Sequence, residues 1–345
     1  MNTSGGYQQL SITGIREEAE GVKTFVLKPE REITYAAGQF LTFVFGDAHG
    51  EERRSYSLSS SPALNEPMQI TLKRIANGKY SRPLIDIIRP GDVLTTTGAA
   101  GQFVLPQDID RYKQVFFFAA GIGITPIYSL MKELLYRYAE IEVILIYSSS
   151  SIKETVFYHE ILALHQKFPQ QLRPEFLISS SQNLSRARLS KWLMPQLLRS
   201  YTKAPQQEQL FYTCGPFAYM RMVTIALEEQ KYAREQLKKE NFDVSRPIAR
   251  REPPDKRAHE VRVHLGSEIK SFVAKYPDTI LAAAKKNGIQ LPYSCETGRC
   301  GSCVMQCTKG AAWMSYNEVL TEKEIEEGKI LTCVSHPVGG PVELK

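Results

Sequence analysis

The feature that most constrains this chain is a group of cysteines near its C-terminal end. Cys295, Cys300 and Cys303 follow a C-x4-C-x2-C pattern, and Cys333 lies 30 residues beyond the last of them. Two glycines within the pattern permit sharp backbone turns that a Cβ atom would block. A tight loop can therefore wrap the first three thiols around one point, whereas a separate segment has to bring in the fourth.

This spacing is that of plant-type ferredoxins, in which four thiolates hold a [2Fe-2S] cluster. The predicted metal ligands are therefore Cys295, Cys300, Cys303 and Cys333, with residues 330–334 predicted as a short strand that carries the last of them. A zinc site that uses Cys307 in place of Cys333 is an alternative, although zinc ribbons favour two separated C-x2-C pairs. A disulfide framework is disfavoured in a long chain without a signal peptide. Cys307 is otherwise predicted to be a buried thiol on the strand that leaves the loop.

Composition is typical of a globular protein with more than one domain. The chain has 345 residues, 43% of them hydrophobic and 23% charged, which predicts two or three domains. The formal charge of +6 is modest, and the most basic stretch, residues 246–257, contains prolines, which favours a linker over a nucleic-acid site. Glycines and a proline interrupt the longest apolar run, residues 115–130, so we expect no membrane span. Reduced cysteines without a targeting segment predict a cytoplasmic protein.

From residue 7 to about residue 106, short runs alternate apolar and polar side chains, which predicts the strands of an antiparallel barrel. Two stretches interrupt this alternation. The first, Arg54-Ser55-Tyr56-Ser57-Leu58-Ser59-Ser60, places a cation, an aromatic ring and several hydroxyls on one predicted strand. The second, Gly78-Lys79-Tyr80-Ser81, precedes a predicted helix with Ser81 as its N-cap. Free N–H groups at a helix start suit a pyrophosphate.

The middle third alternates strands and helices. Residues 115–120 are continuously apolar, as a buried parallel strand is, and Gly121-Ile122-Gly123-Ile124-Thr125-Pro126 leads from them into an amphipathic helix. Further strands are predicted at 143–147, 175–178 and 210–213, the last of them before Cys214-Gly215-Pro216. The pattern predicts a doubly wound sheet with its ligand-binding turns at the carboxyl ends of the strands.

The region around the cysteines begins with a predicted hairpin. Residues 260–265 and 269–273 are its two strands, and Gly266-Ser267 is the turn between them. Asp278 is the predicted N-cap of a following helix, which Gly288 ends.

With these motifs in place, the chain resembles the ferredoxin–NADP reductase superfamily along nearly its whole length. It looks most like members that carry a plant-type ferredoxin domain at the C-terminus, such as the reductase subunit of phenylacetyl-CoA oxygenase and related oxygenase reductases. The resemblance implies an FAD-binding antiparallel β-barrel (residues 1–108) and an NAD(P)H-binding α/β domain with a doubly wound parallel sheet (109–244). A linker (245–258) and an α+β β-grasp [2Fe-2S] ferredoxin domain (259–345) would follow.

The resemblance also implies roles for single residues. In this family an R-x-Y-S motif binds the flavin, a G-x-x-S loop holds the FAD pyrophosphate, and a G-x-G-x-x-P turn and a C-G-P motif lie along the nicotinamide dinucleotide. The implied cofactor-binding residues are Arg54, Tyr56, Ser57, Gly78, Tyr80, Ser81, Gly121, Gly123, Thr125, Pro126, Cys214, Gly215, Pro216 and Phe242. The implied catalytic residues are Ser57, as a hydrogen-bond donor near the reactive flavin nitrogen, Cys214 beside the nicotinamide, and Glu240 of a late E-x-F motif.

The order of these parts has a physical logic. NAD(P)H gives up two electrons together, an iron–sulfur cluster accepts one at a time, and a flavin converts between the two. We therefore expect an NAD(P)H-dependent reductase that passes electrons through FAD and the cluster to a partner protein, an oxygenase component. A reductase of another redox metalloprotein, such as the hybrid-cluster protein, is an alternative. A non-catalytic redox sensor is another, but the sequence contains no stretch that looks like an output module.

The preference between NADH and NADPH is open at this stage. The segment from Ser148 to Lys153, after the second strand of the dinucleotide domain, has no acidic residue to bind a ribose 2′-hydroxyl. Its hydroxyls and Lys153, together with Arg186 or Arg188, are candidates for binding a 2′-phosphate, which gives a slight preference for NADPH. A plain loop fits the same residues.

Overall fold

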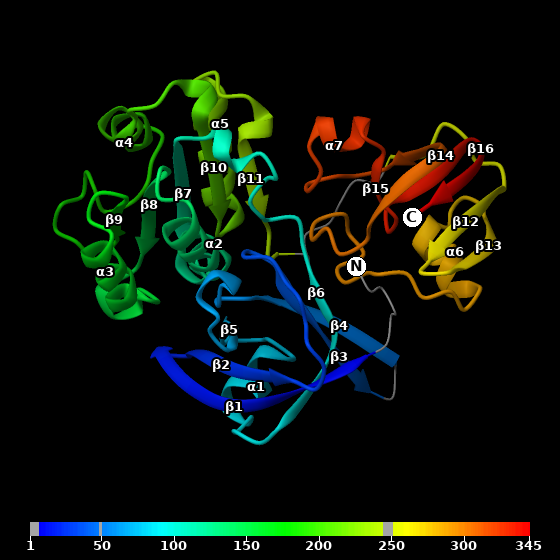
Figure 1. The fold of residues 1–345 in the computed structure, drawn as a ribbon, viewed down its shortest axis with the longest axis horizontal. Helices are drawn as coiled ribbons and strands as arrows, with labels where there is room; N and C mark the ends of the chain where they lie inside the picture. The colour runs from blue at the N-terminus through cyan, green and yellow to red at the C-terminus, as the bar shows by residue number, and fades with distance from the viewer. Residues whose placement is uncertain (1–6, 48–49, 244–250) are drawn as a thin grey trace. The chain divides into compact units, whose positions relative to one another are not determined.

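The computed structural model describes residues 7–47, 50–243 and 251–345. Three domains follow one another along the chain, each with its own sheet (Figure 1). The first two form one compact unit, residues 8–99 and 103–241, and the described residues from 251 onwards belong to a second unit. Within the described parts of the chain, no helix is long and apolar enough to cross a membrane.

The first domain is a six-stranded antiparallel sheet with the strand order β4-β3-β6-β1-β2-β5. A β-bridge between Leu58 and Ile70 joins the end of one outer strand to the other, so the sheet curls into the predicted barrel. The alternation expected in β5 is confirmed, since Met68, Ile70 and Leu72 are buried. Among the described residues of this domain, the strands and the α-helix are β1 Gln8–Ala19, β2 Val22–Pro29, β3 Phe40–Asp47, β4 Gly50–Ser57, β5 Met68–Lys73, α1 Ser81–Asp86 and β6 Val93–Ala100.

Two expectations for this domain need correction. The strand that carries Arg54 ends at Ser57, so the hydroxyls of residues 59 and 60 lie beyond it rather than on it. Ser81 is the first residue of α1 and not its N-cap, a position held by Tyr80 without a side-chain hydrogen bond. The reason is local: the Ser81 hydroxyl accepts a hydrogen bond from the backbone N–H of Ile75 at 3.1 Å, and so it closes the preceding loop instead of capping the helix.

The second domain is the predicted doubly wound fold, with five parallel strands in the order β11-β10-β7-β8-β9. All seven residues of β7 are buried, because α2 and α3 cover one face of the sheet and α4 and α5 the other. Its α-helices and strands are β7 Gln114–Ala120, α2 Ile124–Arg137, β8 Glu142–Ser149, α3 Tyr158–Lys167, β9 Leu172–Ile178, α4 Leu193–Tyr201, β10 Gln209–Cys214, α5 Phe217–Glu229 and β11 Leu237–Glu240.

The third domain has a mixed five-stranded sheet in the order β13-β12-β16-β14-β15. The predicted hairpin is confirmed, since β12 and β13 are antiparallel and Leu265 pairs with Glu268, while β12 and β16 run parallel. Its strands and α-helices are β12 His259–Leu265, β13 Glu268–Ala274, α6 Ile280–Lys286, β14 Val304–Met314, α7 Glu322–Glu326, β15 Lys329–Leu331 and β16 Ser335–Leu344.

The N-cap of α6 lies one residue later than expected. Thr279 holds that position, and its hydroxyl accepts a hydrogen bond from the Ala282 N–H at 3.2 Å. The carboxylate of Asp278, the predicted cap, instead pairs with the Lys286 ammonium at 2.6 Å. Upstream, part of the predicted linker lies outside the described residues, and Asp255 near its end accepts a hydrogen bond from the backbone N–H of Gly339 at 3.0 Å.

Candidate functional site

The three residues expected to be catalytic lie together in the first unit. Ser57 ends β4, and its hydroxyl donates a hydrogen bond to Oε2 of Glu240, at the end of β11, at 3.1 Å. Cys214 ends β10 and is paired with Glu240 in the parallel ladder between these strands. All three side chains are buried. The site therefore joins a residue of the barrel to two residues at the edge of the doubly wound sheet.

Burial controls the protonation of this group. Desolvation raises the pKa of Glu240 to about 8, and the hydrogen bond from Ser57 only partly opposes this. Desolvation, reinforced by the nearby Glu240 carboxyl, raises the pKa of the Cys214 thiol well above its usual range. At neutral pH, Glu240 therefore holds a proton in contact with Ser57, and Cys214 is a neutral thiol.

The two glycine-containing turns of the dinucleotide domain pack against each other. A Cβ atom on Gly123 would lie 2.3 Å from the Cys214 carbonyl oxygen, and one on Gly215, at φ +156°, would lie 2.9 Å from the Cβ of Ala120. These turns follow β7 and β10, two neighbouring parallel strands. The predicted turns thus meet at the carboxyl edge of the sheet, where open α/β sheets bind their ligands.

The remaining residues of the first turn stabilise it. Thr125 is buried at the start of α2, and its hydroxyl donates to the Ile122 carbonyl at 3.1 Å. Pro126 is the third residue of α2 and is also buried, while Pro216 is the N-cap of α5. These side chains shape the backbone of the turns, whose N–H groups and open surface are what a dinucleotide could contact.

The two predicted flavin motifs of the barrel also come together. The Arg54 guanidinium and the Lys79 ammonium lie 5.0 and 5.1 Å from the centroid of the Tyr80 ring, whose other neighbour, Phe45, stacks on it at 4.2 Å. Both cations pair with the Glu52 carboxylate, Arg54 at 2.9 Å. Two cations against one carboxylate leave a net positive charge beside an aromatic ring, which suits the pyrophosphate of FAD.

The loop before α1 leaves little room for a side chain at Gly78, because the Ser81 hydroxyl that bonds to the Ile75 N–H lies against it. A Cβ atom on Gly78 would lie 2.1 Å from the Ser81 hydroxyl oxygen. On β4, Tyr56 packs against Phe43 with ring centroids 5.9 Å apart, and burial raises the pKa of its hydroxyl to about 12. Phe242, two residues after β11, is 43% exposed. The barrel residues therefore fit an FAD with its phosphates near Arg54.

The four predicted cluster thiols form two pairs. The Cys303 and Cys333 sulfurs lie 3.2 Å apart, and a hydrogen bond with the Cys300 thiol lowers the pKa of the Cys295 thiol. All six cysteines of the chain are free thiols. Among the described residues, no three His, Cys, Asp or Glu side chains surround a single metal ion. Two pairs of thiols are what two irons sharing four thiolates need, so these residues fit a [2Fe-2S] cluster.

The loop backbone agrees with this arrangement. Gly298 and Gly301 both have φ +74°, in the left-handed region where a side chain would be strained. Cys333 lies in the turn between β15 and β16 rather than on a strand as expected. The turn is held beside the loop because the backbone N–H of Thr332 donates to the Cys303 carbonyl at 3.1 Å.

Cys307 points elsewhere. It lies on β14, with its sulfur 3.4 Å from the Lys309 carbonyl oxygen, and partial burial raises the pKa of its thiol. It is on the strand that leaves the loop, as predicted, but it is only partly buried.

The residues considered for NADPH lie in adjacent loops. The backbone N–H groups of Ser179 and Ser180 donate to the carbonyls of Ser149 and Ser150 at 2.9 and 3.0 Å, so the loops after β8 and β9 are joined. Arg186 in the second loop pairs with Glu175 at 2.7 Å. Lys153 lies in a 3₁₀ turn, Ile152–Glu154, of the first loop.

Three family models match successive parts of the chain. Residues 10–105 match the family described as oxidoreductase FAD-binding domain, residues 117–224 the oxidoreductase NAD-binding domain, and residues 263–338 the 2Fe-2S iron-sulfur cluster binding domain.

Relatives also match along nearly the whole chain. The ferredoxin reductase component of 3-ketosteroid-9-alpha-monooxygenase from Rhodococcus rhodochrous is 31% identical, over 95% of this chain and 94% of that protein. The glycine betaine monooxygenase reductase subunit of Pseudomonas aeruginosa is 27% identical, over 98% and 95%. The solved structure of phthalate dioxygenase reductase shares the fold, with a TM-score of 0.60 and 24% identity over 99% of this chain and 98% of that one.

Proposed function

The chain belongs to the family of ferredoxin reductase components that carry an FAD-binding, an NAD-binding and a [2Fe-2S] domain, and on that premise we propose that it is the reductase component of a multicomponent oxygenase. It is an NAD(P)H oxidoreductase of the ferredoxin reductase type, with FAD and a [2Fe-2S] cluster as cofactors. The proposal concerns the protein that receives the electrons.

The oxygenase partner is inferred from the relatives, and the observation that carries the electron path is the meeting of Ser57 and Cys214 at Glu240. A flavin motif and a dinucleotide motif, 157 residues apart in the chain, end at one buried carboxyl group. Hydride transfer needs the nicotinamide and the flavin face to face, and only a site shared between the barrel and the sheet can hold them so. When bound, the FAD converts the two-electron chemistry of the nicotinamide into the one-electron steps that a cluster accepts.

The residues of this site have separable roles in the proposal. In this structure the Ser57 hydroxyl donates to Oε2 of Glu240. The Glu240 carboxyl, whose pKa is raised to about 8, holds a proton at neutral pH that it can donate to the Ser57 oxygen, and this exchange would free the Ser57 O–H to point toward the flavin. The buried, neutral Cys214 side chain would lie beside the nicotinamide and exclude water from it. In the barrel, Arg54 binds the FAD phosphates and the Tyr56 ring orients the flavin.

Cys295, Cys300, Cys303 and Cys333 hold the cluster, from which electrons leave for the partner. The sequence resembles the reductase of phenylacetyl-CoA oxygenase, whereas the relatives reported above belong to ketosteroid and glycine betaine monooxygenases. We infer that the partner is the oxygenase component of a system related to these three, and that both proteins work in the cytoplasm. NADPH is slightly preferred as the electron donor, because Lys153 and Arg188 lie in loops at the carboxyl ends of β8 and β9.

A Cys300→Ser variant tests this electron path. We expect it to retain NAD(P)H-driven reduction of FAD and of ferricyanide, and to lose electron delivery to a purified oxygenase component. Cys307→Ser is the matched control and should deliver electrons normally. Candidate acceptors are the oxygenase components for phenylacetyl-CoA, ketosteroids and glycine betaine, and the hybrid-cluster protein. Turnover with the hybrid-cluster protein alone would contradict the oxygenase assignment, and normal delivery by Cys300→Ser would contradict the proposed role of the cluster.

A further inference from the structure

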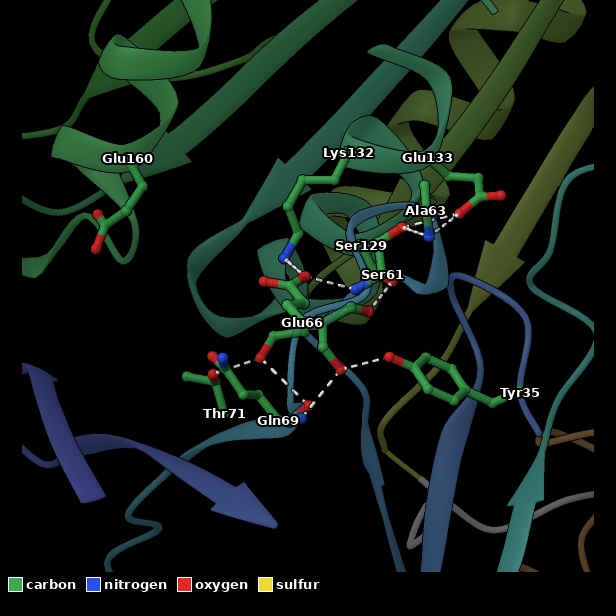
Figure 2. A network of polar contacts seen from close by, with 12 residues as sticks. Tyr35, Ser61, Ala63, Glu66, Gln69, Thr71, Ser129, Lys132, Glu133 and Glu160 are labelled. Atoms are coloured by element: carbon green, nitrogen blue, oxygen red, sulfur yellow. Dashed lines mark hydrogen bonds and ion pairs between the residues drawn. The ribbon is translucent and has the colours of Figure 1, made fainter. Parts of the chain in front are cut away.

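The amphipathic helix α2 buries polar side chains as well as its apolar face. Ser129, Lys132 and Glu133 occupy positions i, i+3 and i+4 and are 0%, 3% and 9% exposed. Lysine and glutamate are almost never so buried unless they are paired. All three contact residues 60–66 of the barrel, a segment that includes the 3₁₀ turn Pro62–Leu64 (Figure 2). We call these contacts the α2 clamp.

Two of the three contacts are hydrogen bonds to this segment. The Ser129 hydroxyl donates to the Ser60 carbonyl at 2.5 Å. Oε2 of Glu133 accepts from the Ser61 hydroxyl at 2.8 Å and from the Ala63 N–H at 3.2 Å. Because these bonds end on backbone atoms as well as side chains, they specify where the backbone of the segment lies along α2.

The third contact is an ion pair. The Lys132 ammonium binds Oε1 of Glu66, and the same oxygen accepts a hydrogen bond from the Ser61 N–H at 2.7 Å. The ammonium also lies 4.5 Å from the centroid of the Tyr128 ring. A shift of the helix by one turn would leave a buried ammonium and a carboxylate without partners, so the pair permits one register only.

The clamp extends into the barrel. Ser60, whose carbonyl accepts the hydrogen bond from Ser129, is also bonded to the barrel through its side chain. Its hydroxyl lies 2.7 Å from the Tyr35 hydroxyl and accepts a hydrogen bond from the Gln69 N–H at 3.0 Å. Ser59 reaches the Thr71 hydroxyl on β5 at 2.9 Å. The segment is thus attached to the strands behind it, and α2 is tied to the barrel as a whole.

The α2 clamp lies close in sequence to both halves of the candidate site. Ser60 lies three residues after Ser57, the serine that meets Glu240, and α2 begins at Ile124, directly after the Gly121-x-Gly123 turn. Ile124 and Ser129 are about 1.4 helical turns apart, so a displacement at one is passed along the helix to the other. We propose that the α2 clamp positions the nicotinamide-binding turn relative to the flavin, and that Ser129, Lys132, Glu133 and Glu66 are positioning residues for hydride transfer.

This inference rests on the NAD(P)H-to-FAD step of the proposed function, in which NAD(P)H loses two electrons and FAD gains them. It predicts an effect on the rate of that step rather than on binding. A misplacement of about 1 Å remote from the reacting atoms can cost on the order of 100-fold in rate. A clamp that only held the domains together would affect stability or cofactor retention instead.

The test uses the holoenzyme and anaerobic stopped-flow measurement of FAD reduction at saturating NAD(P)H. We expect Lys132→Met and Ser129→Ala to slow the limiting rate by about 10- to 100-fold, with the NAD(P)H dissociation constant changed by less than about threefold. The charge-transfer absorbance of the stacked nicotinamide and flavin should weaken. Lys132→Arg, which keeps the charge, should recover most of the rate. Arg111→Met, which breaks an exposed ion pair with Asp108, is the matched control.

A second variant protects the test against misfolding. In Lys132→Met/Glu66→Gln both charges are removed, so neither is left buried without its partner, and the new amide oxygen at position 66 can still accept the hydrogen bond from the Ser61 N–H; the limiting rate should nevertheless remain low. The proposal would be overturned if this variant and Ser129→Ala both had the limiting rate of the wild type. It would also be overturned if the variants lost stability or FAD while their charge-transfer absorbance was unchanged, because the clamp would then only hold the domains together. A wild-type protein whose FAD is not reduced by NAD(P)H would instead refute the proposed function itself.

Discussion

The buried carboxyl of Glu240 should make the stability of the first unit depend on pH. Its pKa is raised from 4.5 to about 8 in the folded protein. Between these values the folded state binds more protons than the unfolded state, so this group makes the free energy of unfolding fall as pH rises through that window. Below the lower value the group is protonated in both states and has no such effect.

The magnitude follows from the two pKa values. Between about pH 5.5 and pH 8, the loss assigned to Glu240 is about 3 kcal/mol, from ~1.4 kcal/mol per unit of pKa difference. Glu240→Gln removes the titration while keeping the shape of the side chain. We therefore expect the variant to gain about 3 kcal/mol relative to wild type over this interval.

Native-state hydrogen exchange measures this change in one unit of a multidomain protein. Amides of β7, read by mass spectrometry at fixed free FAD, should exchange more slowly in Glu240→Gln than in wild type, by a ratio that grows about 100-fold between pH 5.5 and pH 8. Glu235→Gln, at an exposed carboxylate five residues upstream, is the control and should show no such trend. A constant ratio between Glu240→Gln and wild type across this range would refute the assignment of the raised pKa.

Three further predictions concern the cofactors. Cys333→Ser should lose iron and labile sulfide, whereas Cys307→Ser should keep about two irons per chain, as measured by metal and sulfide analysis; the opposite result would show that the ligands are misassigned. Gly123→Ala should weaken NAD(P)H binding at least about tenfold without loss of FAD, measured by titration, because the added Cβ would collide with the Cys214 carbonyl oxygen at 2.3 Å. Arg54→Ala should lower FAD retention on gel filtration by removing a charge-assisted contact worth about 1.5–3 kcal/mol; unchanged retention would exclude Arg54 from the phosphate site.

Much of the architecture could be predicted because it depends on neighbouring residues. The apolar run that became β7 needs helices on both faces, and the Gly266-Ser267 hairpin needs only a turn between two alternating segments. The cysteine spacing indicates a loop by itself, and the positive φ of Gly298 agrees with it. In each case the pattern lies within a few residues, so the backbone has little choice.

Errors of one or two residues came from competing local hydrogen bonds. Ser81 and Asp278 both looked like helix caps, but one hydroxyl closes a loop and the other side chain pairs with Lys286. Thr279, one residue after Asp278, also has a side-chain oxygen that can cap the helix, and this oxygen accepts the capping hydrogen bond. Sequence patterns rank such alternatives poorly because their free energies differ by less than about 1 kcal/mol.

Only the tertiary structure decided which distant residues meet. The contact between Ser57 and Glu240 spans 183 residues, and the α2 clamp joins Ser61 to Glu133 across 72. Any serine or glutamate of this chain can form such a bond, and the residues adjacent to it in the sequence do not indicate which partner it will have. The partner is selected when apolar burial brings the barrel and the sheet together, since a buried carboxyl or ammonium must then find whatever polar group lies opposite.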